Sequence, residues 1–336
     1  MAMHPRTNCD QDQVVELLRG ANRVLITTHV KPDGDAFGSV VALGSALKFL
    51  GKTVRMVVMG PVPGSLGGLK GAGDLEIFGE GFGLGELDLI VVVDTGAWSQ
   101  VSEMKDVLSG REDKMLVVDH HLQGDIEAKH LFIDTGAAAC AEIVGEIVDG
   151  FGEEKLKGLA IINEALYLGI ATDTGWFRFS NTTPRTHRWA AELISRGVDH
   201  AGMYLVQENS MRVQKLDLMV RGLQSIRYYR DGAVAVMVLR KEDFAETGAL
   251  MEETERLIDY PQMVETVQMV VLISEGVNVG DPVRMSFRSK PGDDAINVSD
   301  FAGQFGGGGH ARAAGAKLHE PLADVVEKIV VAVAGI

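Results

Sequence analysis

Short apolar runs that end in aspartate or histidine recur through the first half of the chain, and this pattern constrains the fold more than any other feature. Four such runs lead into acidic or imidazole side chains: Val24 to Thr28 before His29, Asp33 and Asp35; Leu89 to Val93 before Asp94; Met115 to Val118 before Asp119, His120 and His121; and Leu166 to Ala171 before Asp173. In a parallel α/β sheet, residues just past the strand ends line one crevice. The four segments are therefore expected to bring their Asp and His side chains to one place.

Helical patterns alternate with these apolar runs. Gly38 to Leu50 is small and apolar at helical spacing, and Ala137 to Asp149 and Glu154 to Ala171 also have the pattern of helices. Further strands are expected at Thr53 to Met59 and Leu131 to Ile133. The alternation predicts an α/β fold with a mostly parallel sheet that is flanked by helices.

The length of 336 residues favours two domains over one. We expect a first α/β domain over residues 1–185, a helical linker over 186–222, and a smaller α/β domain over 223–336. Three strands and a closing helix are expected in the last part: Ala233 to Leu239, Val267 to Ile273, Val283 to Phe287, and Leu322 to Ala334.

The bulk composition excludes several classes of function. The net charge of −15 argues against a broad electrostatic grip on long nucleic acid, although a few local cations could still hold a short nucleotide. No apolar run approaches the ~18 residues of a membrane span, and the polar segment Met1 to Asp12 lacks the apolar region of a signal peptide. Cys9 and Cys140 form no metal motif. We therefore expect a soluble protein of the reducing cytoplasm, with no membrane partner.

The spacing His29-x-x-x-Asp33-x-Asp35 is the first of the candidate metal-binding motifs. Imidazole and carboxylate together suit Mn²⁺, Zn²⁺ or Fe²⁺ better than Ca²⁺, which prefers oxygen alone. Each motif also has a plain structural alternative, such as a turn whose aspartates bond their own backbone, or a lone Asp94 or Asp173 that acts as a cap. The co-occurrence of four motifs in one predicted sheet favours a dinuclear metal centre.

A dinuclear centre implies chemistry at phosphorus. Two divalent cations ~3.5–4 Å apart can activate a bridging water and stabilise charge during an in-line phosphoryl displacement. A bridging carboxylate is needed to hold the pair, and a histidine beside them can polarise the phosphate or the leaving oxygen.

A run of four glycines followed by histidine, Gly306-Gly307-Gly308-Gly309-His310, lies near the C-terminus. Backbone N–H groups in such a run can approach a phosphate closely, and the side chains of His310, Arg312 and Arg288 can add donors. The alternative is a flexible glycine linker without a ligand. The position of the run between a predicted helix, Asn297 to Phe305, and an alanine-rich segment favours binding.

The Asp and His motifs resemble those of the DHH phosphoesterase superfamily, which is named for the triplet seen here as Asp119-His120-His121. The resemblance covers residues 1–185 and implies two bound cations, with Mn²⁺ typical and Mg²⁺ or Co²⁺ as alternatives. One cation would take His29, Asp33 and Asp94, and the other Asp35, Asp94, His120 and Asp173, with Asp94 bridging. The resemblance also implies that His121 faces the substrate phosphate and that Asp119 orients the adjacent histidine, so that Asp94, Asp119 and His121 carry the catalysis.

The glycine run and Ala313-Ala314-Gly315 resemble the associated DHHA1 domain, and this implies that Arg288 and His310 clamp the substrate. The segment Thr172 to Pro184 is similar to the fourth motif of the short-chain oligoribonucleases, or nanoRNases. There Arg178 would contact substrate, with a surface ion pair as the alternative. This subfamily implies hydrolysis of short RNA oligonucleotides and, in some members, dephosphorylation of the nucleotide bisphosphate 3′-phosphoadenosine 5′-phosphate. It also implies a homodimer.

Two other functions stay open from the sequence. A cyclic or linear dinucleotide phosphodiesterase would use nearly the same core and clamp. A metal-dependent nucleotide sensor without turnover is a different class of protein, and the complete ligand set argues against it. The manganese pyrophosphatases share the first four motifs, but their second domain lacks the glycine-rich histidine motif.

Overall fold

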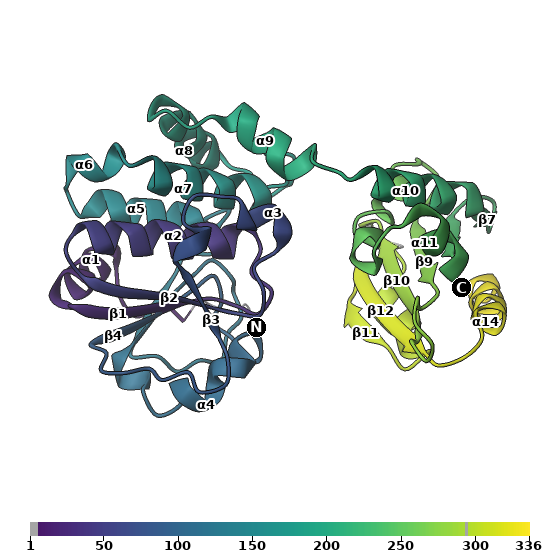
Figure 1. Cartoon of the computed structure of the whole chain (residues 1–336), viewed down its shortest axis with the longest axis horizontal. Coiled ribbons are helices and arrows are strands. Elements are labelled where there is room, and N and C mark those ends of the chain that lie inside the picture. Colours follow the sequence, from purple (N-terminus) through teal and green to yellow (C-terminus); the bar gives the residue numbers. More distant parts are fainter. Residues whose placement is uncertain (1–5, 293–294) are drawn as a thin grey trace. The chain divides into compact units, whose positions relative to one another are not determined.

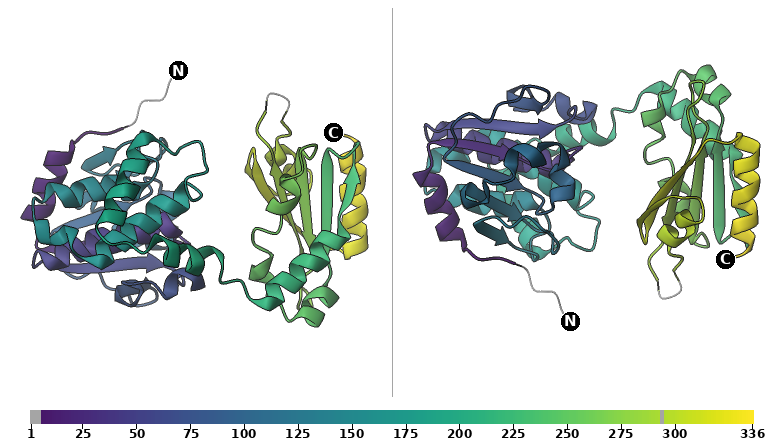
Figure 2. Two further views of the ribbon diagram at one scale, coloured as in Figure 1. Left: turned by 90° about the horizontal axis from the view of Figure 1, so that it is seen from above. Right: turned by 90° about the horizontal axis from the view of Figure 1, so that it is seen from below.

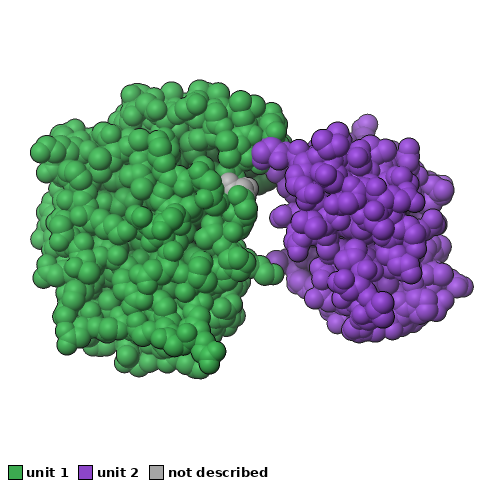
Figure 3. Space-filling model, viewed as in Figure 1, with its two compact units in different colours: residues 1–209 green, residues 210–336 purple. Residues whose placement is uncertain are grey.

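The computed structural model describes residues 6–292 and 295–336, and the chain divides into two compact units. Unit 1 is Met1–Asn209 and unit 2 is Ser210–Ile336 (Figure 3). The first five residues of the polar N-terminal segment lie outside the described range. Among the described residues, no helix has both the length and the apolar character that a bilayer crossing requires.

A parallel sheet forms the centre of unit 1. Within the described residues it has six strands in the order β3-β2-β1-β4-β5-β6, and every neighbouring pair runs parallel. The strands are β1 (Arg23–Thr27), β2 (Thr53–Met59), β3 (Leu75–Phe78), β4 (Leu89–Val93), β5 (Met115–Asp119) and β6 (His130–Ile133). The strand order reverses between β1 and β4. In open α/β sheets, ligands bind at such a reversal, beyond the carboxyl ends of the strands.

Helices cover both faces of this sheet (Figures 1 and 2). One face packs against α1 (Gln11–Gly20), α2 (Gly34–Phe49), α5 (Cys140–Gly150) and α7 (Ala160–Asp173), and the other against η2 (Trp98–Met104) and α4 (Lys105–Leu108). Alternate strand residues point to the two layers, as Ile26 and Val91 do to the first and Leu25 and Val92 to the second. Burial on both faces explains the continuous apolar runs. The predicted α/β class is confirmed.

Short elements complete unit 1. They are α3 (Gly64–Gly67), η1 (Ala72–Asp74), η3 (Glu112–Lys114), α6 (Glu154–Lys157), α8 (Pro184–Ser195) and α9 (His200–Glu208). Strand β3 was not predicted, because it is a short edge strand without a buried face that would mark it in the sequence. Thr183 is the N-cap of α8, and its side chain accepts a hydrogen bond from the N–H of Thr186.

The fourth apolar run is helical, and its prediction as a strand end is wrong. Leu166 to Ala171 lies inside α7, and Asp173 is the last residue of that helix. The helix predicted from Glu154 to Ala171 is two helices, because α6 ends at its C-cap Gly158. Helix α7 packs against α2, α5 and α8. It therefore lacks the polar face that distinguishes a surface helix from a buried strand in a sequence.

A mixed sheet forms the centre of unit 2. In the described part of this unit its order is β11-β12-β10-β9-β8-β7, and only β8 and β9 pair in parallel. The strands are β7 (Arg227–Tyr229), β8 (Val234–Leu239), β9 (Met269–Ser274), β10 (Val283–Ser289), β11 (Gly308–His310) and β12 (Ala313–Leu318). The predicted strands correspond to β8, β9 and β10. Strands β11 and β12 were not predicted because glycine and alanine are poor strand formers.

Helices cover both faces of this second sheet as well. One face packs against α10 (Val213–Ser225) and α11 (Lys241–Thr247), and the other against α13 (Val298–Gly303) and α14 (Leu322–Ala334). Helix α14 has the predicted bounds. The short η4 (Met251–Thr254) and α12 (Asp259–Gln262) lie between α11 and β9.

Candidate metal centre

The loop after β1 presents His29 and Asp33 to the crevice. Asp33 is the N-cap of α2, and its Oδ1 accepts hydrogen bonds from two backbone N–H groups of the first helical turn, both at 3.0 Å. The ring Nδ1 of His29 donates to the carbonyl of Val30 at 2.9 Å. The other ring nitrogen, Nε2, lies 3.8 Å from Asp33 Oδ1 and 3.4 Å from Asp94 Oδ2. This tautomer leaves the Nε2 lone pair of His29 available to a ligand.

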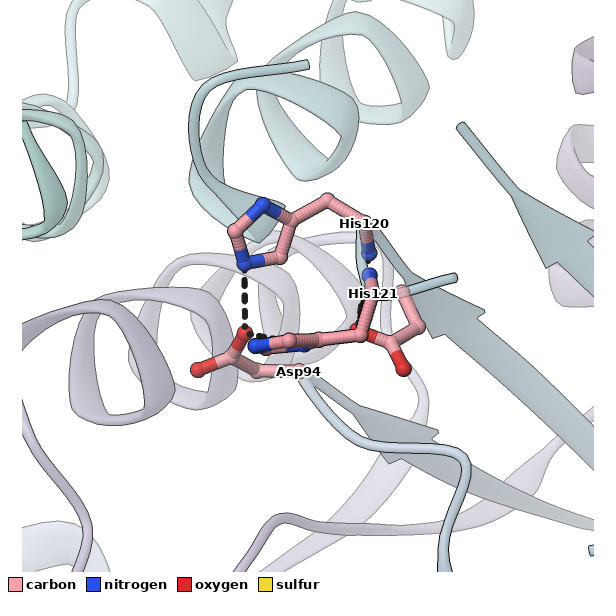
Figure 4. Close-up of side chains that lie close together, drawn as sticks. Asp94, His120 and His121 are labelled. Carbon is pink, nitrogen blue, oxygen red and sulfur yellow. Dashed lines mark hydrogen bonds and ion pairs between the residues drawn. The ribbon is translucent and has the colours of Figure 1, made fainter. Parts of the chain in front are cut away.

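Asp94, directly after β4, is the central carboxylate. It is 3% exposed, and its φ of 61° is uncommon for a residue with a side chain. Its Oδ2 lies 3.4 Å from His29 Nε2. Its Oδ1 faces the ring of His120 (Figure 4), and the distance to His120 Nε2 is 3.4 Å. Oδ1 is buried, and apart from this ion-pair contact with His120 it accepts no hydrogen bond from the described part of the chain. A buried, strained carboxylate between two imidazoles is typical of a group that a ligand completes.

The triplet Asp119, His120 and His121 closes the carboxyl end of β5. Asp119 Oδ1 accepts hydrogen bonds from the backbone N–H groups of His120 and His121, at 2.8 and 3.1 Å, and from the ring Nδ1 of His121 at 2.8 Å. The side chain of His120 is 13% exposed and that of His121 is 56% exposed. His120 therefore points into the acidic cluster, whereas His121 is oriented by Asp119 and stays open to solvent.

Asp35 is held at the centre by the N-terminus of α5. Its Oδ2 accepts from the N–H of Cys140 at 2.6 Å, and its Oδ1 accepts from the N–H of Ala141 at 2.8 Å. The N-cap of α5, Ala139, has no side chain that could cap the helix. Asp35 therefore performs this role from another helix, and the positive end of the α5 dipole favours its charge.

Asp173 reaches the centre because α2 and α7 pack closely. A Cβ atom at Gly34, the first residue of α2, would lie 2.3 Å from Oγ1 of Thr172, so only glycine permits this approach. The Nε2 of His120 then lies 3.8 Å from Asp173 Oδ2 and 3.9 Å from Asp35 Oδ2. Two helices thus supply carboxylates to an imidazole from a strand end.

The six predicted metal ligands form overlapping groups. In each group, one nitrogen or oxygen atom per residue lies within 4.8 Å of the others. The groups are His29, Asp33 and Asp94; Asp35, His120 and Asp173; and Asp94, Asp119, His120 and His121. The tertiary structure therefore brings all six residues together and places Asp94 in contact with both predicted ligand sets.

The pKa values in the cluster reflect an excess of carboxylates. Burial alone would lower the pKa of His29, but Asp33 and Asp94 raise it to about 10. Burial opposes protonation of His120 in the same way, yet Asp94 and Asp35 raise its pKa to about 9. Burial, together with the charges of Asp94 and Asp173, also holds the pKa of Asp35 well above its ordinary value. The protons that these residues retain offset the negative charge of the cluster, as a bound cation would.

Asp173 shows the same excess of negative charge. Burial raises its pKa to about 6, against the lowering effect of the His120 imidazole. The donor set as a whole fits divalent transition cations, because it combines imidazole nitrogen with carboxylate oxygen. The shared position of Asp94, with one oxygen beside each of two imidazoles, fits a pair of cations held by one carboxylate.

Comparison with known proteins identifies the family. A model of the DHH family, N-terminal domain, matches residues 23–170, and a model of the DHHA1 domain matches residues 231–335. The chain is 31% identical over 307 residues to the bifunctional oligoribonuclease and PAP phosphatase NrnA of Thermus thermophilus, a match that covers 91% of this chain and 87% of the relative. This chain belongs to the DHH/DHHA1 family. It is also 27% identical to the protein of the same name from Bacillus subtilis, over 88% of this chain and 89% of the relative.

Solved structures share the DHH/DHHA1 fold. An exopolyphosphatase-related protein from Bacteroides fragilis has a TM-score of 0.85 at 24% identity, and the match covers 97% of this chain and 95% of that protein. RecJ of Thermus thermophilus, solved in complex with Mn²⁺, has a TM-score of 0.51 at 13% identity and covers 94% of this chain but 53% of RecJ. At these identities, the two structures show the fold alone.

In the DHHA1 domain, Arg288 and His310 lie on the same face of the sheet. Arg288 of β10 is in register with Ala313 of β12, and Ala313 is in register with His310 of β11. Directly opposed residues of neighbouring strands point to the same side, so only the small Ala313 separates the two side chains. The preceding residue, Arg312, has a buried Nη1 atom without a hydrogen-bond partner in the described residues.

The glycine run of the DHHA1 domain is part of the sheet. Gly306 and Gly307 donate backbone hydrogen bonds to the end of α13, and Gly308–His310 is the exposed edge strand β11. A Cβ atom at Gly307 would lie 2.2 Å from the carbonyl oxygen of Gly315, so close packing explains why position 307 is a glycine. The regular structure excludes the flexible linker that the sequence left open.

The segment after Asp173 in the DHH domain contains one residue that the sequence indicated and one that it missed. Arg178 is exposed, and its Nε donates to the carbonyl of Gly175 at 2.6 Å. Asn181 lies in the segment Thr172 to Pro184, and no role of its own was predicted for it from the sequence. Its Nδ2 donates to the carbonyl of Ala138 at 3.0 Å and to that of Asp173 at 3.2 Å. No local pattern indicates these two contacts, because one partner lies 43 residues away.

Proposed function

We propose that this DHH/DHHA1 protein is a metal-dependent phosphoesterase that hydrolyses short oligoribonucleotides to mononucleotides and also dephosphorylates 3′-phosphoadenosine 5′-phosphate. The observation that carries the proposal is the buried Asp94, with the Nε2 atoms of His29 and His120 each 3.4 Å from one of its two oxygens. The substrate class is supported by two relatives, 31% and 27% identical over most of both chains, that are named oligoribonucleases and PAP phosphatases.

In this proposal, two Mn²⁺ ions bind at the centre. His29, Asp33 and Asp94 would hold one ion, and Asp35, Asp94, His120 and Asp173 the other. Imidazole and carboxylate donors favour Mn²⁺ over Ca²⁺, and the structural relative RecJ was solved with Mn²⁺. When bound, such a pair supplies a water of lowered pKa and stabilises charge during an in-line displacement at phosphorus.

We assign His121 to the reacting phosphate. Its Nδ1 donates to Asp119 Oδ1 at 2.8 Å, so its Nε2 is directed to the open side. The hydrogen bond that His121 donates to the Asp119 carboxylate raises the pKa of His121 despite burial, and this favours the protonated ring. Nε2–H can then donate to a phosphate oxygen or give its proton to the leaving oxygen. Asp119 contributes by fixing the ring, as carboxylate partners of catalytic histidines do.

We assign the binding of the 5′-terminal nucleotide to the DHHA1 domain. Arg288 and His310 lie on one face, with Ala313 between them, and a guanidinium can hold a phosphate through two parallel hydrogen bonds. The Nη1 of Arg312, which has no hydrogen-bond partner in the described residues, is a further donor. We assign the glycine run, Gly306 to Gly309, to the same substrate site, although the N–H groups of Gly306 and Gly307 already donate to the end of α13. In the DHH domain, the exposed Arg178 is assigned to contact the substrate.

The remaining assignments concern localisation, oligomeric state and domain bounds. We infer a cytoplasmic protein, because Cys9 and Cys140 are free thiols. A homodimer follows from the family resemblance, and light scattering after size-exclusion chromatography tests it. We keep residues 1–185 as the catalytic domain, 186–222 as the helical linker and 223–336 as the substrate-binding domain. The two family models match within the first and the last of these ranges.

The deciding experiment measures mononucleotide release from a 5′-phosphorylated RNA dinucleotide with Mn²⁺. Parallel reactions contain 3′-phosphoadenosine 5′-phosphate, a cyclic dinucleotide and pyrophosphate. The proposal expects rapid hydrolysis of the RNA dinucleotide that a chelator abolishes, together with turnover of the bisphosphate. Turnover of the cyclic dinucleotide alone would replace the proposal with a cyclic dinucleotide phosphodiesterase. Mn²⁺ binding without any turnover would indicate a nucleotide sensor.

A further inference from the structure

Asp173 and Asp35 reach the metal centre from helix ends of opposite polarity. Asp35 is held by N–H groups at the N-terminus of α5. Asp173 is the last residue of α7, where the backbone carbonyls carry partial negative charge that disfavours a carboxylate. The position of Asp173 therefore needs support from outside its own helix.

The side-chain amide of Asn181 provides a contact at this helix end. Its Nδ2 donates to the backbone carbonyl of Asp173 at 3.2 Å. That carbonyl belongs to the last turn of α7, where carbonyl groups have no partner within the helix. The hydrogen bond satisfies the carbonyl and reduces the negative field beside the Asp173 carboxylate.

The same nitrogen also contacts the segment that holds Asp35. Asn181 Nδ2 donates to the carbonyl of Ala138 at 3.0 Å, and the N–H of Ala138 donates to Glu142 Oε2 at 3.3 Å. Ala138 precedes the N-cap of α5, so its placement sets where the N–H groups of Cys140 and Ala141 meet Asp35. Both acceptors of Asn181 are carbonyls, and an amide NH₂ has one hydrogen for each.

We propose that Asn181 is a positioning residue that sets the separation of Asp35 and Asp173, and with it the affinity for the second of the two cations. This inference rests on the proposed two-cation centre. Asn181 uses its side-chain nitrogen as a donor to two backbone carbonyls, and through them it acts on two of the candidate ligands, Asp35 and Asp173. The first cation, at His29, Asp33 and Asp94, uses neither of the two ligands, Asp35 and Asp173, that Asn181 positions.

Substitutions of Asn181 separate this role from a general effect on folding. Asn181 is exposed, so truncation leaves no buried cavity and the protein is expected to fold. Asn181→Ala removes both hydrogen bonds. Asn181→Asp keeps the size of the side chain but sets a carboxylate oxygen against two carbonyl oxygens, and we expect it to be the more damaging change.

A matched control is Asn163→Ala. Asn163 lies on the same helix as Asp173 and is fully buried, and its Nδ2 donates to the carbonyl of Lys157 at 2.8 Å. This bond lies near the start of α7, away from the centre. We expect a lower melting temperature for this variant and unchanged Mn²⁺ affinities.

The measurement is Mn²⁺ binding to the full chain by isothermal titration calorimetry, with half-saturation of activity as a second readout. Supporting groups around metal ligands typically contribute 10- to 100-fold in affinity. We expect Asn181→Ala to weaken one of two Mn²⁺ sites by about 10-fold or more and to leave the other site unchanged. Excess Mn²⁺ should restore most of the turnover.

Three different outcomes would each contradict either the positioning role of Asn181 or the proposed two-cation centre. Wild-type affinity at both sites in the two Asn181 variants would refute the positioning role and leave the metal centre intact. Equal weakening of both sites would refute the assignment to the second cation. Fewer than two Mn²⁺ ions bound by the wild-type chain would refute the proposed centre itself.

Discussion

Asp94→Asn is the substitution that tests the metal centre most directly. Asparagine has the same shape as aspartate and tolerates the left-handed φ of 61° at this position. The change therefore removes one charge and little else. We expect the metal-free variant to fold, and we expect Mn²⁺ binding and phosphoesterase activity to fall together.

The size of the loss follows from the position of Asp94 between the two ligand groups. At 4 Å and an effective dielectric constant of about 20, two unit charges interact by about 4 kcal/mol. Since each 1.4 kcal/mol corresponds to about a factor of ten, and Mn²⁺ carries two positive charges, the loss of this carboxylate predicts a decrease in affinity of at least roughly 10³-fold for a cation that Asp94 contacts. Because Asp94 is 3% exposed, solvent screens little of this interaction.

The assay is a Mn²⁺ titration, monitored by calorimetry and by mononucleotide release. Asp88→Asn is the matched control, because Asp88 precedes the amino end of β4 and binds the N–H groups of Asn22 and Arg23, far along the strand from Asp94. The control should bind Mn²⁺ as the wild type does. If Asp94→Asn kept Mn²⁺ affinity and turnover within about threefold of the wild type, well below the 10³-fold loss expected from the charge, the shared-ligand argument would be wrong.

Three further predictions follow from the same geometry. Mn²⁺ affinity should rise with pH, because His29 and His120, with pKa values of about 10 and about 9 in the metal-free protein, must release protons to bind the cation. Calorimetry in buffers of different ionisation enthalpy would detect these protons. An affinity that is independent of pH would contradict the assignment of the two histidines as ligands. His121→Gln should lower kcat by about 10²- to 10⁴-fold and leave Mn²⁺ binding intact, whereas a loss of binding would make His121 a ligand. Arg288→Gln should raise KM for a 5′-phosphorylated dinucleotide by roughly tenfold, as for the loss of one charged hydrogen bond, and Arg284→Gln on the same strand should not; equal effects of the two would refute the clamp.

Much of the candidate site could be predicted from the sequence because most of its residues directly follow a recognisable strand. A parallel strand that is buried on both faces must be apolar throughout, so the first polar residue after the run marks the point where the chain leaves the core. Asp94 and Asp119 are such residues, and His29 is the first ionisable residue after Thr27 and Thr28. The α/β class was predictable for the same reason and is confirmed. The DHH and DHHA1 domains were predicted from the resemblance of their motifs, and both family models match.

The sequence could not determine contacts between distant segments. It assigned Leu166 to Ala171 both to a strand end and to the predicted helix Glu154 to Ala171, because a helix buried among α2, α5 and α8 has no polar face that decides between the two. It did not indicate that the N–H groups of Cys140 and Ala141 hold Asp35, since these residues lie 105 and 106 positions away. The alignment of Arg288 with His310 likewise depends on the register of three strands, two of which are poor in strand-forming residues.

The sequence by itself therefore determined which side chains are available for metal binding and at which strand ends most of them lie. The tertiary structure decided their separations, the buried state of Asp94 and Asp35, and the raised pKa values of His29 and His120. The physical reason is that residue identity and local pattern are properties of the sequence, whereas distances and electrostatic fields depend on close packing between segments that are far apart in it. A glycine at position 34, which lets α2 approach Thr172, is one such case.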